Sequence, residues 1–207
     1  PSRLVESLRD TGYSHQAAFA DIVDNCIAAN ASNVVIDITQ DFMGNDLSVA
    51  FYDNGEGMSV DELKNAMRYG SDKRPSPKSL GKFGMGLKTA STAFCRRLSV
   101  ISIKDNVPSI RVWDIDEIID QDEWVLLEPN LDEYSKYLDK LKTLTDGSGT
   151  VVIWTRVDRL ITNNGTDYLQ KAMDTIIAEI SQHLSATFGK FLIGVDNFNN
   201  TQADVFT

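Results

Sequence analysis

The 207-residue chain has few of the side chains that build disulfide frameworks or transition-metal sites, because it contains only two cysteines and two histidines. Cys26, Cys95, His15 and His183 are scattered and show none of the short spacings that zinc ligands require. We therefore expect both cysteines to be small core residues of a protein in a reducing compartment. Both histidines are expected to be structural.

Long hydrophobic runs and excess positive charge are also lacking. No run of about 18 apolar residues occurs, which excludes a membrane-spanning helix, and the N-terminal PSRLVESLRD has no apolar signal segment. The sequence thus predicts a cytoplasmic protein without a membrane partner. Thirty acidic residues against 20 basic ones give a net charge of −10, which argues against a general nucleic-acid scaffold. A local basic patch, such as Arg96 and Arg97, remains compatible with this charge.

What the chain does contain is the composition of a globular domain, 42% hydrophobic and 24% charged. Helical periodicity is predicted over 13–30, 59–68, 86–96, 132–144 and 167–188, with a capping box at Ser59 and Glu62. Strand-like runs cover 33–39, 47–53, 98–104, 109–115, 123–128, 149–157 and 191–195. Because these elements come in unequal blocks, they predict an α+β fold with helices on one face of a mostly antiparallel sheet.

The segment DIVDNCIAAN, residues 21–30, combines an apolar helical stripe with polar residues on the opposite side. Asp21 and Asn25 stand four residues apart and therefore share one helix face. Such a face is ordinarily solvated surface. A carboxylate and a carboxamide on one face are also suited to act as a general base and a metal ligand.

The segment DNGEGM, residues 53–58, follows a predicted strand and precedes a predicted helix. Gly55 and Gly57 allow a turn with positive φ and the close approach of a flat ligand. A plain Asx-type turn at Asp53 explains the same residues, so this motif alone is weak.

Residues 70–86, GSDKRPSPKSLGKFGMG, form a long segment with no helix or strand pattern. Loops of this length are usually functional lids or disordered. The segment leads into the helical pattern of GKFGMGLKTAS, and glycines before a helix leave backbone N–H groups free for a phosphate. The G-x-x-G-x-G spacing matches neither the dinucleotide fingerprint nor the P-loop, and a flexible glycine linker is the alternative.

Taken in order, these motifs and the GSGT that opens the strand at 149–157 resemble the GHKL ATPase superfamily of gyrase B, heat-shock chaperones, histidine kinases and MutL. LVESLRDTGYSHQAAFADIVDNCIAANASNVVI and GKFGMGLKTASTAFCRRLSV look most similar to MORC-like members and related prokaryotic ones. The resemblance implies a Bergerat fold, a two-layer sandwich with helices on a mixed, mainly antiparallel sheet. It also implies ATP and Mg²⁺ as ligands, and a nucleotide-dependent homodimer as the assembly.

The resemblance assigns roles to individual residues. Asp21 takes the position of the catalytic base, Asn25 that of the Mg²⁺ ligand, and Asp53 that of the carboxylate that reads the adenine amine. The adenine-site positions are Gly55, Gly57, Met58 and Thr150, whose hydroxyl would help hold Asp53 and a water. The phosphate-binding positions are Gly81, Phe83, Gly84, Met85, Gly86 and Leu87. The cations that could neutralise phosphate charge are Lys73, Lys82 and Lys88.

Two positions depart from the family pattern. The family usually has glutamate where this chain has Asp21, which is one methylene shorter, and often has aspartate where this chain has Ala28. The sequence therefore predicts nucleotide binding with slow hydrolysis. A non-hydrolysing nucleotide sensor and a histidine-kinase catalytic domain remain alternatives, although no phospho-acceptor helical hairpin precedes the motifs.

The expected domain organisation is an ATP-binding domain at 1–182, followed at 183–207 by the start of a domain that resembles the transducer of gyrase and MutL. ATP and ADP are the expected small-molecule partners. A DNA client would have to be bound through other domains, because this chain is acidic.

Overall fold

The computed structural model describes residues 1–10, 12–40, 47–68, 86–161 and 166–189, and the side chains of 166–170 are outside the description. The helices are α1 (Ser2–Arg9), α2 (His15–Ala28), α3 (Val60–Met67), α4 (Gly86–Thr92), α5 (Ile115–Gln121), η1 (a 3₁₀ helix, Leu131–Tyr134), α6 (Ser135–Leu144) and α7 (Thr166–Phe188). The strands are β1 (Val34–Gln40), β2 (Leu47–Asp53), β3 (Cys95–Lys104), β4 (Val107–Asp114), β5 (Leu126–Leu127) and β6 (Gly149–Val157).

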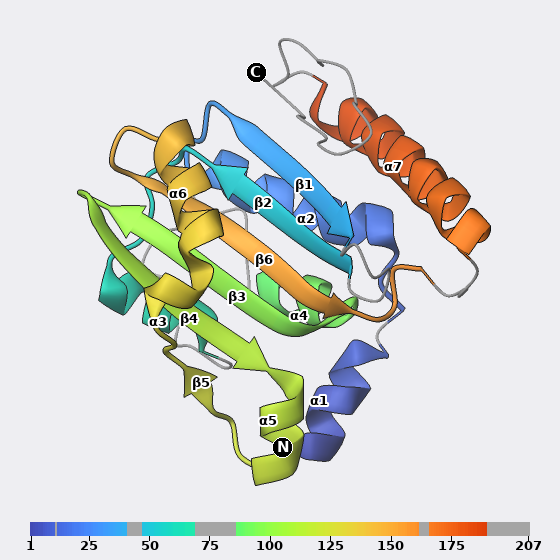
Figure 1. Ribbon diagram of the computed structural model, residues 1–207, viewed down its shortest axis with the longest axis horizontal. Helices are drawn as coiled ribbons and strands as arrows, with labels where there is room; N and C mark the ends of the chain where they lie inside the picture. The colour runs from blue at the N-terminus through green and yellow to red at the C-terminus, as the bar shows by residue number, and fades with distance from the viewer. Residues whose placement is uncertain (11, 41–46, 69–85, 162–165, 190–207) are drawn as a thin grey trace.

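The strands form one sheet in the order β1-β2-β6-β3-β4-β5, and every pairing among the described strands is antiparallel (Figure 1). The last strand in the sequence, β6, thus lies in the middle of the sheet. Its first residues therefore sit beside the end of β2, where Asp53 pairs with Thr150, and beside β3, where Ser102 pairs with Thr150. Three segments that are far apart in the sequence meet at this point.

The sheet has an apolar core on both of its faces, because residues on either side of each strand alternate between two clusters. One face lies under α2 and α4, and its strand residues include Ile36, Phe51, Val100 and Trp154 (Figure 1). The other face lies under η1 and α6, and its strand residues include Val35, Ala50, Ile101 and Ile153. The predicted α+β sandwich is confirmed, with the addition that α6 covers the face that the sequence analysis left open. Leu138 and Leu141 of α6 supply the apolar stripe that fills it.

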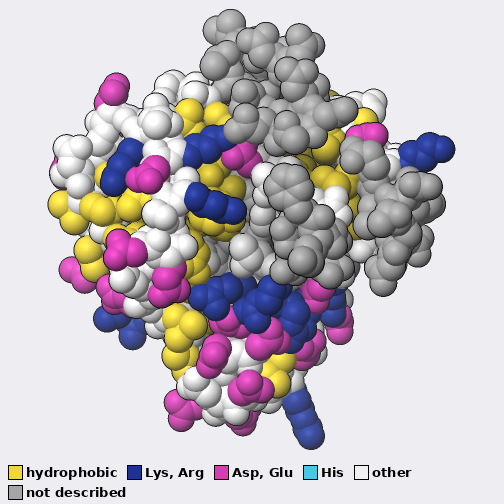
Figure 2. All heavy atoms as spheres, viewed as in Figure 1, with side chains coloured by type: hydrophobic (Ala, Val, Ile, Leu, Met, Phe, Trp, Pro, Cys, Tyr) yellow, Lys and Arg dark blue, Asp and Glu magenta, His cyan; other side chains and the backbone are white. Residues whose placement is uncertain are grey.

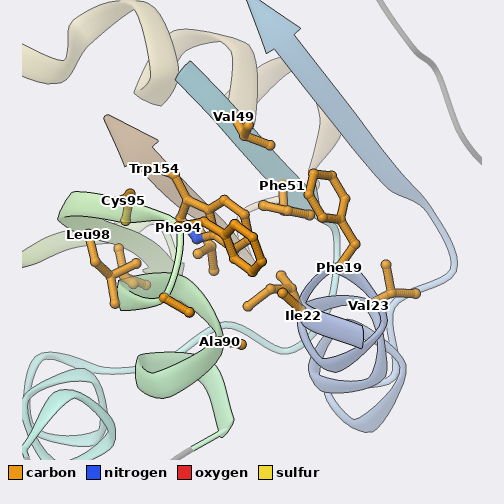
Figure 3. Close-up of a cluster of buried hydrophobic side chains, with 14 of the residues drawn as sticks. Phe19, Ile22, Val23, Val49, Phe51, Ala90, Phe94, Cys95, Leu98 and Trp154 are labelled. Carbon is orange, nitrogen blue, oxygen red and sulfur yellow. The ribbon is translucent and has the colours of Figure 1, made fainter. Parts of the chain in front are cut away.

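Helix α2 is anchored to the sheet by aromatic packing. Phe19 lies edge-on to Phe51, with ring centroids 4.9 Å apart, and edge-on to Trp154, with centroids 5.4 Å apart (Figure 3). Ile22 and Val23 are also buried in this cluster. Such rings bury large apolar areas and prefer edge-to-face contact. The anchored face therefore fixes the rotation of α2 and keeps its polar side turned away from the sheet.

Several predicted boundaries were wrong. The helix predicted over 86–96 ends at Thr92, because Cys95 already pairs with Val157 at the start of β3. The strand predicted over 123–128 shrinks to Leu126–Leu127. Helices α1 and α5 were not predicted; α5 begins where the Asp114 side chain accepts a hydrogen bond from the Asp116 amide.

The predictions for the capping box and for the two cysteines are confirmed. The capping box at Ser59 is confirmed, because both of its reciprocal hydrogen bonds with Glu62 are formed. Cys26 and Cys95 are free, buried core residues. His15 contacts Glu179 of α7, with 2.8 Å between Nε2 and Oε2. None of the described helices is long and apolar enough to cross a membrane.

The predicted division at residue 182 falls inside α7, whose Ile180, Leu184 and Phe188 all pack in the same core as α2. Residues 190–207, with the strand predicted at 191–195, lie outside the described residues. The following domain therefore stays a prediction.

Candidate functional site

The polar side of α2 carries Asp21 and Asn25, both half-buried. The helix begins at its N-cap Ser14, whose hydroxyl accepts a hydrogen bond from the Ala17 amide at 3.2 Å. The Asn25 carboxamide donates from Nδ2 to the Asp21 carbonyl oxygen at 2.7 Å. This bond fixes the amide plane. The acceptor oxygen Oδ1 is thereby left for another partner.

Asp21 lies between two neighbours that belong to different parts of the chain. Its Oδ2 accepts a hydrogen bond from the Tyr13 hydroxyl at 2.6 Å. A Cβ atom added to Gly86, the first residue of α4, would lie 3.8 Å from the same Oδ2. The structure thus brings together two predicted site residues, Asp21 and Gly86, that are 65 positions apart in the sequence (86 − 21).

Asp53 ends β2 as a buried carboxylate, only 5% exposed. Its Oδ1 accepts a hydrogen bond from the Gly55 amide at 2.8 Å, which is the predicted Asx-type turn. Burial raises the pKa of Asp53 to about 6, against the opposing effect of the hydrogen bond from the Gly55 amide and of the neighbouring Cys26 side chain and Thr150 backbone. An Asx turn does not require a carboxylate, since asparagine makes the same turn without the cost of a buried charge.

The glycines of DNGEGM are required by contacts within the protein. Gly57 has φ +62°, and a Cβ there would lie 1.9 Å from the Ile103 carbonyl oxygen. Gly55 lacks the positive φ that was predicted for it. A larger residue is excluded there because an added Cβ atom would lie 2.6 Å from the Ala29 carbonyl oxygen. Both glycines therefore let the turn pack closely against β3 and the end of α2.

A second residue group surrounds Thr150, which is 7% exposed. The predicted contact of its hydroxyl with Asp53 is not made: that hydroxyl lies 2.9 Å from the Ser102 hydroxyl, and Thr150 faces Asp53 through the backbone pairing of β6 with β2. Ser102 also accepts a hydrogen bond from the Met58 amide at 2.8 Å. Sequence reasoning missed Ser102 and Cys26, because nothing in a strand or an apolar helix stripe marks a small polar atom as a neighbour of the site.

The remaining predicted residues divide into two groups. Leu87 packs against the core on the α2 side of the sheet, which we call the main core. Lys88 is only 1% exposed, and its ammonium group donates to the carbonyl oxygens of Ala66 and Arg68 at the end of α3. In this conformation Lys88 therefore points to α3. The predicted phosphate-site residues Lys73, Gly81, Lys82, Phe83, Gly84 and Met85 lie outside the described residues.

The local basic patch suggested by Arg96 and Arg97 is neutralised by acidic neighbours. Arg97 donates to Asp114 at 2.7 Å, and Arg96 donates from Nε to Asp116 at 2.8 Å. Arg156 pairs with both of these aspartates. Figure 2 likewise shows basic and acidic side chains interspersed on the α6 face. The structure therefore offers no basic nucleic-acid surface at these arginines.

The described residues contain no cluster of three or more His, Cys, Asp or Glu side chains that could hold a metal ion. Mg²⁺ does not need such a cluster, because it keeps several waters and is held through few protein oxygens together with substrate phosphates. The oriented Asn25 Oδ1 fits this donor type.

Comparisons with known proteins give a matching family profile and several relatives. The profile described as "Histidine kinase-, DNA gyrase B-, and HSP90-like ATPase" matches residues 13–150, which span α2, the DNGEGM turn, α4 and the start of β6. This chain is 29% identical to mouse ATPase MORC2B over 96 residues (44% of this chain, 9% of the relative), and 29% identical to ATPase morc-1 of Caenorhabditis elegans over 103 residues (48% and 12%). It is 30% identical to Protein MICRORCHIDIA 7 of Arabidopsis thaliana over 91 residues (41% and 13%).

The matched segments thus span about a tenth of the length of these relatives. The profile match covers two thirds of the chain and includes every described element that holds Asp21, Asn25 and Asp53. The antiparallel sheet with α2 and α4 on one face agrees with it. The chain is also similar to MORC ATPases. It belongs to the histidine kinase-, DNA gyrase B- and HSP90-like (GHKL) ATPase family.

Proposed function

We propose that this chain binds Mg·ATP between α2, the end of β2 and α4, and hydrolyses it slowly. The observation that carries the proposal is the buried carboxylate of Asp53. It lies where β2, α2 and β6 meet and keeps a charge that the Asx turn does not need. An acceptor at this place suits the exocyclic amine of adenine, and a charge-assisted hydrogen bond offsets part of the cost of burial.

Asn25 and Asp21 take the two remaining roles. Asn25 would hold Mg²⁺ through Oδ1, and the ion would neutralise phosphate charge when bound. Asp21 is the general base: it accepts a proton from the attacking water as the water oxygen bonds the γ-phosphorus and the bond to ADP breaks. Its short side chain supports slow turnover, because a base must come within hydrogen-bond reach of the proton it removes.

The lid and the dimer belong to the same proposal. Residues 70–86 would close over the γ-phosphate through backbone N–H groups, and the closed state would pair two copies of the chain. The support is the glycine-rich sequence next to Gly86, which begins α4 beside Asp21, together with the family to which the chain belongs. Hydrolysis would then reopen the lid. The free buried thiols support the proposed cytoplasmic location.

Steady-state phosphate release by this chain tests the proposal. Asp21→Ala should retain ATP binding while its turnover falls by roughly 10²–10⁴-fold, the usual contribution of a general base. Asp139→Ala, on the exposed side of α6, is a matched control that removes a surface carboxylate without touching the site. Unchanged turnover in Asp21→Ala would reduce Asp21 to a surface carboxylate.

A non-hydrolysing nucleotide sensor is the second candidate. It is favoured by Asp21 in the place of the family glutamate and by Ala28, an exposed methyl group in the place of a carboxylate. ATP binding without any phosphate release would select this candidate. Phosphotransfer to a partner histidine would instead identify a histidine kinase.

A further inference from the structure

Tyr13 stands just before the helix that carries the proposed base, and its ring is half-buried against the main core. Its hydroxyl donates to Oδ2 of Asp21 at 2.6 Å. The pKa of Tyr13 is raised, first by this hydrogen bond and then by burial, so the phenol remains a protonated donor at neutral pH. None of the sequence motifs pointed to this contact: the predicted helical pattern began at Tyr13, whereas α2 begins at His15, so Tyr13 lies before the observed helix.

The same phenol also reaches α4. The Thr89 side chain is hydrogen-bonded to Tyr13, and the Thr89 hydroxyl lies 3.4 Å from the Gly86 carbonyl oxygen. Tyr13 therefore joins the carboxylate on α2 to the first turn of the helix that follows residues 70–86. A Cβ atom added to Gly86 itself would lie 3.8 Å from Oδ2 of Asp21.

Because the Tyr13 hydroxyl contacts both Asp21 and Thr89, it restricts the carboxylate of Asp21. Asp21 has two side-chain torsions, and a hydrogen bond to Oδ2 selects one combination of them. With Oδ2 occupied, Oδ1 is the oxygen that is left to accept a proton. Catalytic groups lose much of their effect when their geometry is not fixed, and supporting hydrogen bonds usually supply that fixation.

We propose that Tyr13 is a positioning residue for Asp21: its hydroxyl, itself bonded by Thr89, holds Oδ2 so that Oδ1 faces the attacking water. The inference rests on the proposed function, since it requires that Asp21 act as the base. Tyr13 does not bind ATP in this account. Its removal should therefore change the chemical step and leave nucleotide affinity unchanged.

The test is a double-mutant cycle of Tyr13→Phe and Asp21→Asn, with single-turnover hydrolysis of radiolabelled ATP followed for hours and ATP affinity measured by calorimetry. Phenylalanine keeps the ring that packs on the core. In the parent background, Tyr13→Phe should lower the hydrolysis rate by about tenfold with ATP affinity within about twofold of the parent. In the Asp21→Asn background, it should have no further effect, because coupled residues are not additive.

Two more variants sharpen the test. Tyr137→Phe, on α6 at the opposite face of the sheet, removes the hydroxyl of another half-buried tyrosine and should leave the rate unchanged. Thr89→Val removes the second contact of the phenol and should lower the rate in the same direction as Tyr13→Phe, by a smaller factor. It provides an independent reading if Tyr13→Phe fails to fold, which its melting temperature would reveal.

Several results would overturn the inference. An unchanged hydrolysis rate in Tyr13→Phe would mean that the phenol only packs against the core, and a faster rate would mean that its hydroxyl slows hydrolysis. An equal loss in both backgrounds would mean that Tyr13 acts independently of Asp21, and a parallel loss of affinity would make it a nucleotide contact. If the parent shows no turnover, the proposed ATP hydrolysis is wrong, and the inference about Tyr13 is wrong with it. If the parent turns over and depends on Asp21, only the role of Tyr13 is in question.

Discussion

Replacement of the buried carboxylate by its neutral isostere, Asp53→Asn, should make the protein more stable and a worse nucleotide binder. Burial raises the pKa of Asp53 from 3.8 to about 6 in the folded chain. A difference of this size corresponds to roughly 3 kcal/mol of folding free energy when the group is charged. Asparagine keeps an acceptor for the Gly55 amide and carries no charge. We therefore expect a net gain of about 1–2 kcal/mol at pH 7.5, because the carboxamide gives back part of the difference through weaker hydrogen bonds.

The pH dependence of this gain has a definite sign. An acid whose folded pKa is raised binds more protons in the folded state than in the unfolded state between the two values, so the parent loses stability as the pH rises from about 4 to 6. Below about pH 4 the carboxyl is protonated in both states and the cost of the charge disappears. The advantage of Asp53→Asn should therefore be largest above pH 6 and shrink towards zero near pH 4.

Urea unfolding of both proteins at pH 7.5, 5.5 and 4 measures the free energy of unfolding, and calorimetry at pH 7.5 measures ATP affinity. The lost charge-assisted acceptor should weaken ATP binding by at least about tenfold, or 1.4 kcal/mol. If Asp53→Asn is less stable than the parent at every pH and binds ATP with the parental affinity, Asp53 is only a turn residue and the reasoning is refuted.

Three further predictions follow from the same geometry. Asn25→Ala should weaken Mg·ATP binding by about tenfold and leave Mg²⁺-free nucleotide binding little changed, as calorimetry with and without Mg²⁺ would show; an equal effect in both would remove the metal role. Gly57→Ala should lower the free energy of unfolding by about 2 kcal/mol or more, because its Cβ would meet the Ile103 carbonyl oxygen at 1.9 Å; a parental urea midpoint would contradict this close approach. Protease cleavage within 73–82 should slow with a non-hydrolysable ATP analogue and less so with ADP, and equal cleavage in both states would count against a γ-phosphate-dependent lid.

The sequence was a good guide wherever a local rule sets the structure. The helical period that contains Asp21 and Asn25 placed both residues on one face of α2, and the capping box at Ser59 marked the start of α3. Both depend on neighbours within one helical turn, and a single sequence contains that information.

The sequence was a poor guide wherever distant segments decide. The helix predicted to run past Thr92 gives way to β3, since the pairing of Cys95 with Val157 of β6 outweighs local helical preference. The prediction of helices on one face of the sheet missed the second helix layer, α6, which covers the other side of β6, although Val151, Val152, Ile153 and Trp154 form an unbroken apolar run.

The same limit applies to the site. The order of the motifs identified Asp53, but its partners Cys26 and Thr150 come from other elements, and these partners and its burial determine its pKa. Tyr13 was invisible for the same reason, because its contact with Asp21 depends on how the chain enters α2.

The central claim is that Asp53 reads the adenine of a bound ATP, and a calorimetric comparison of Mg·ATP with Mg·GTP on the unmodified chain tests it most directly. Adenine presents an amine to the Asp53 carboxylate, whereas guanine presents a carbonyl oxygen at the same ring position, so that two acceptors would face each other. The account predicts one saturable ATP site and GTP affinity weaker by at least about tenfold. Equal affinity for the two nucleotides, or no ATP binding, would contradict it.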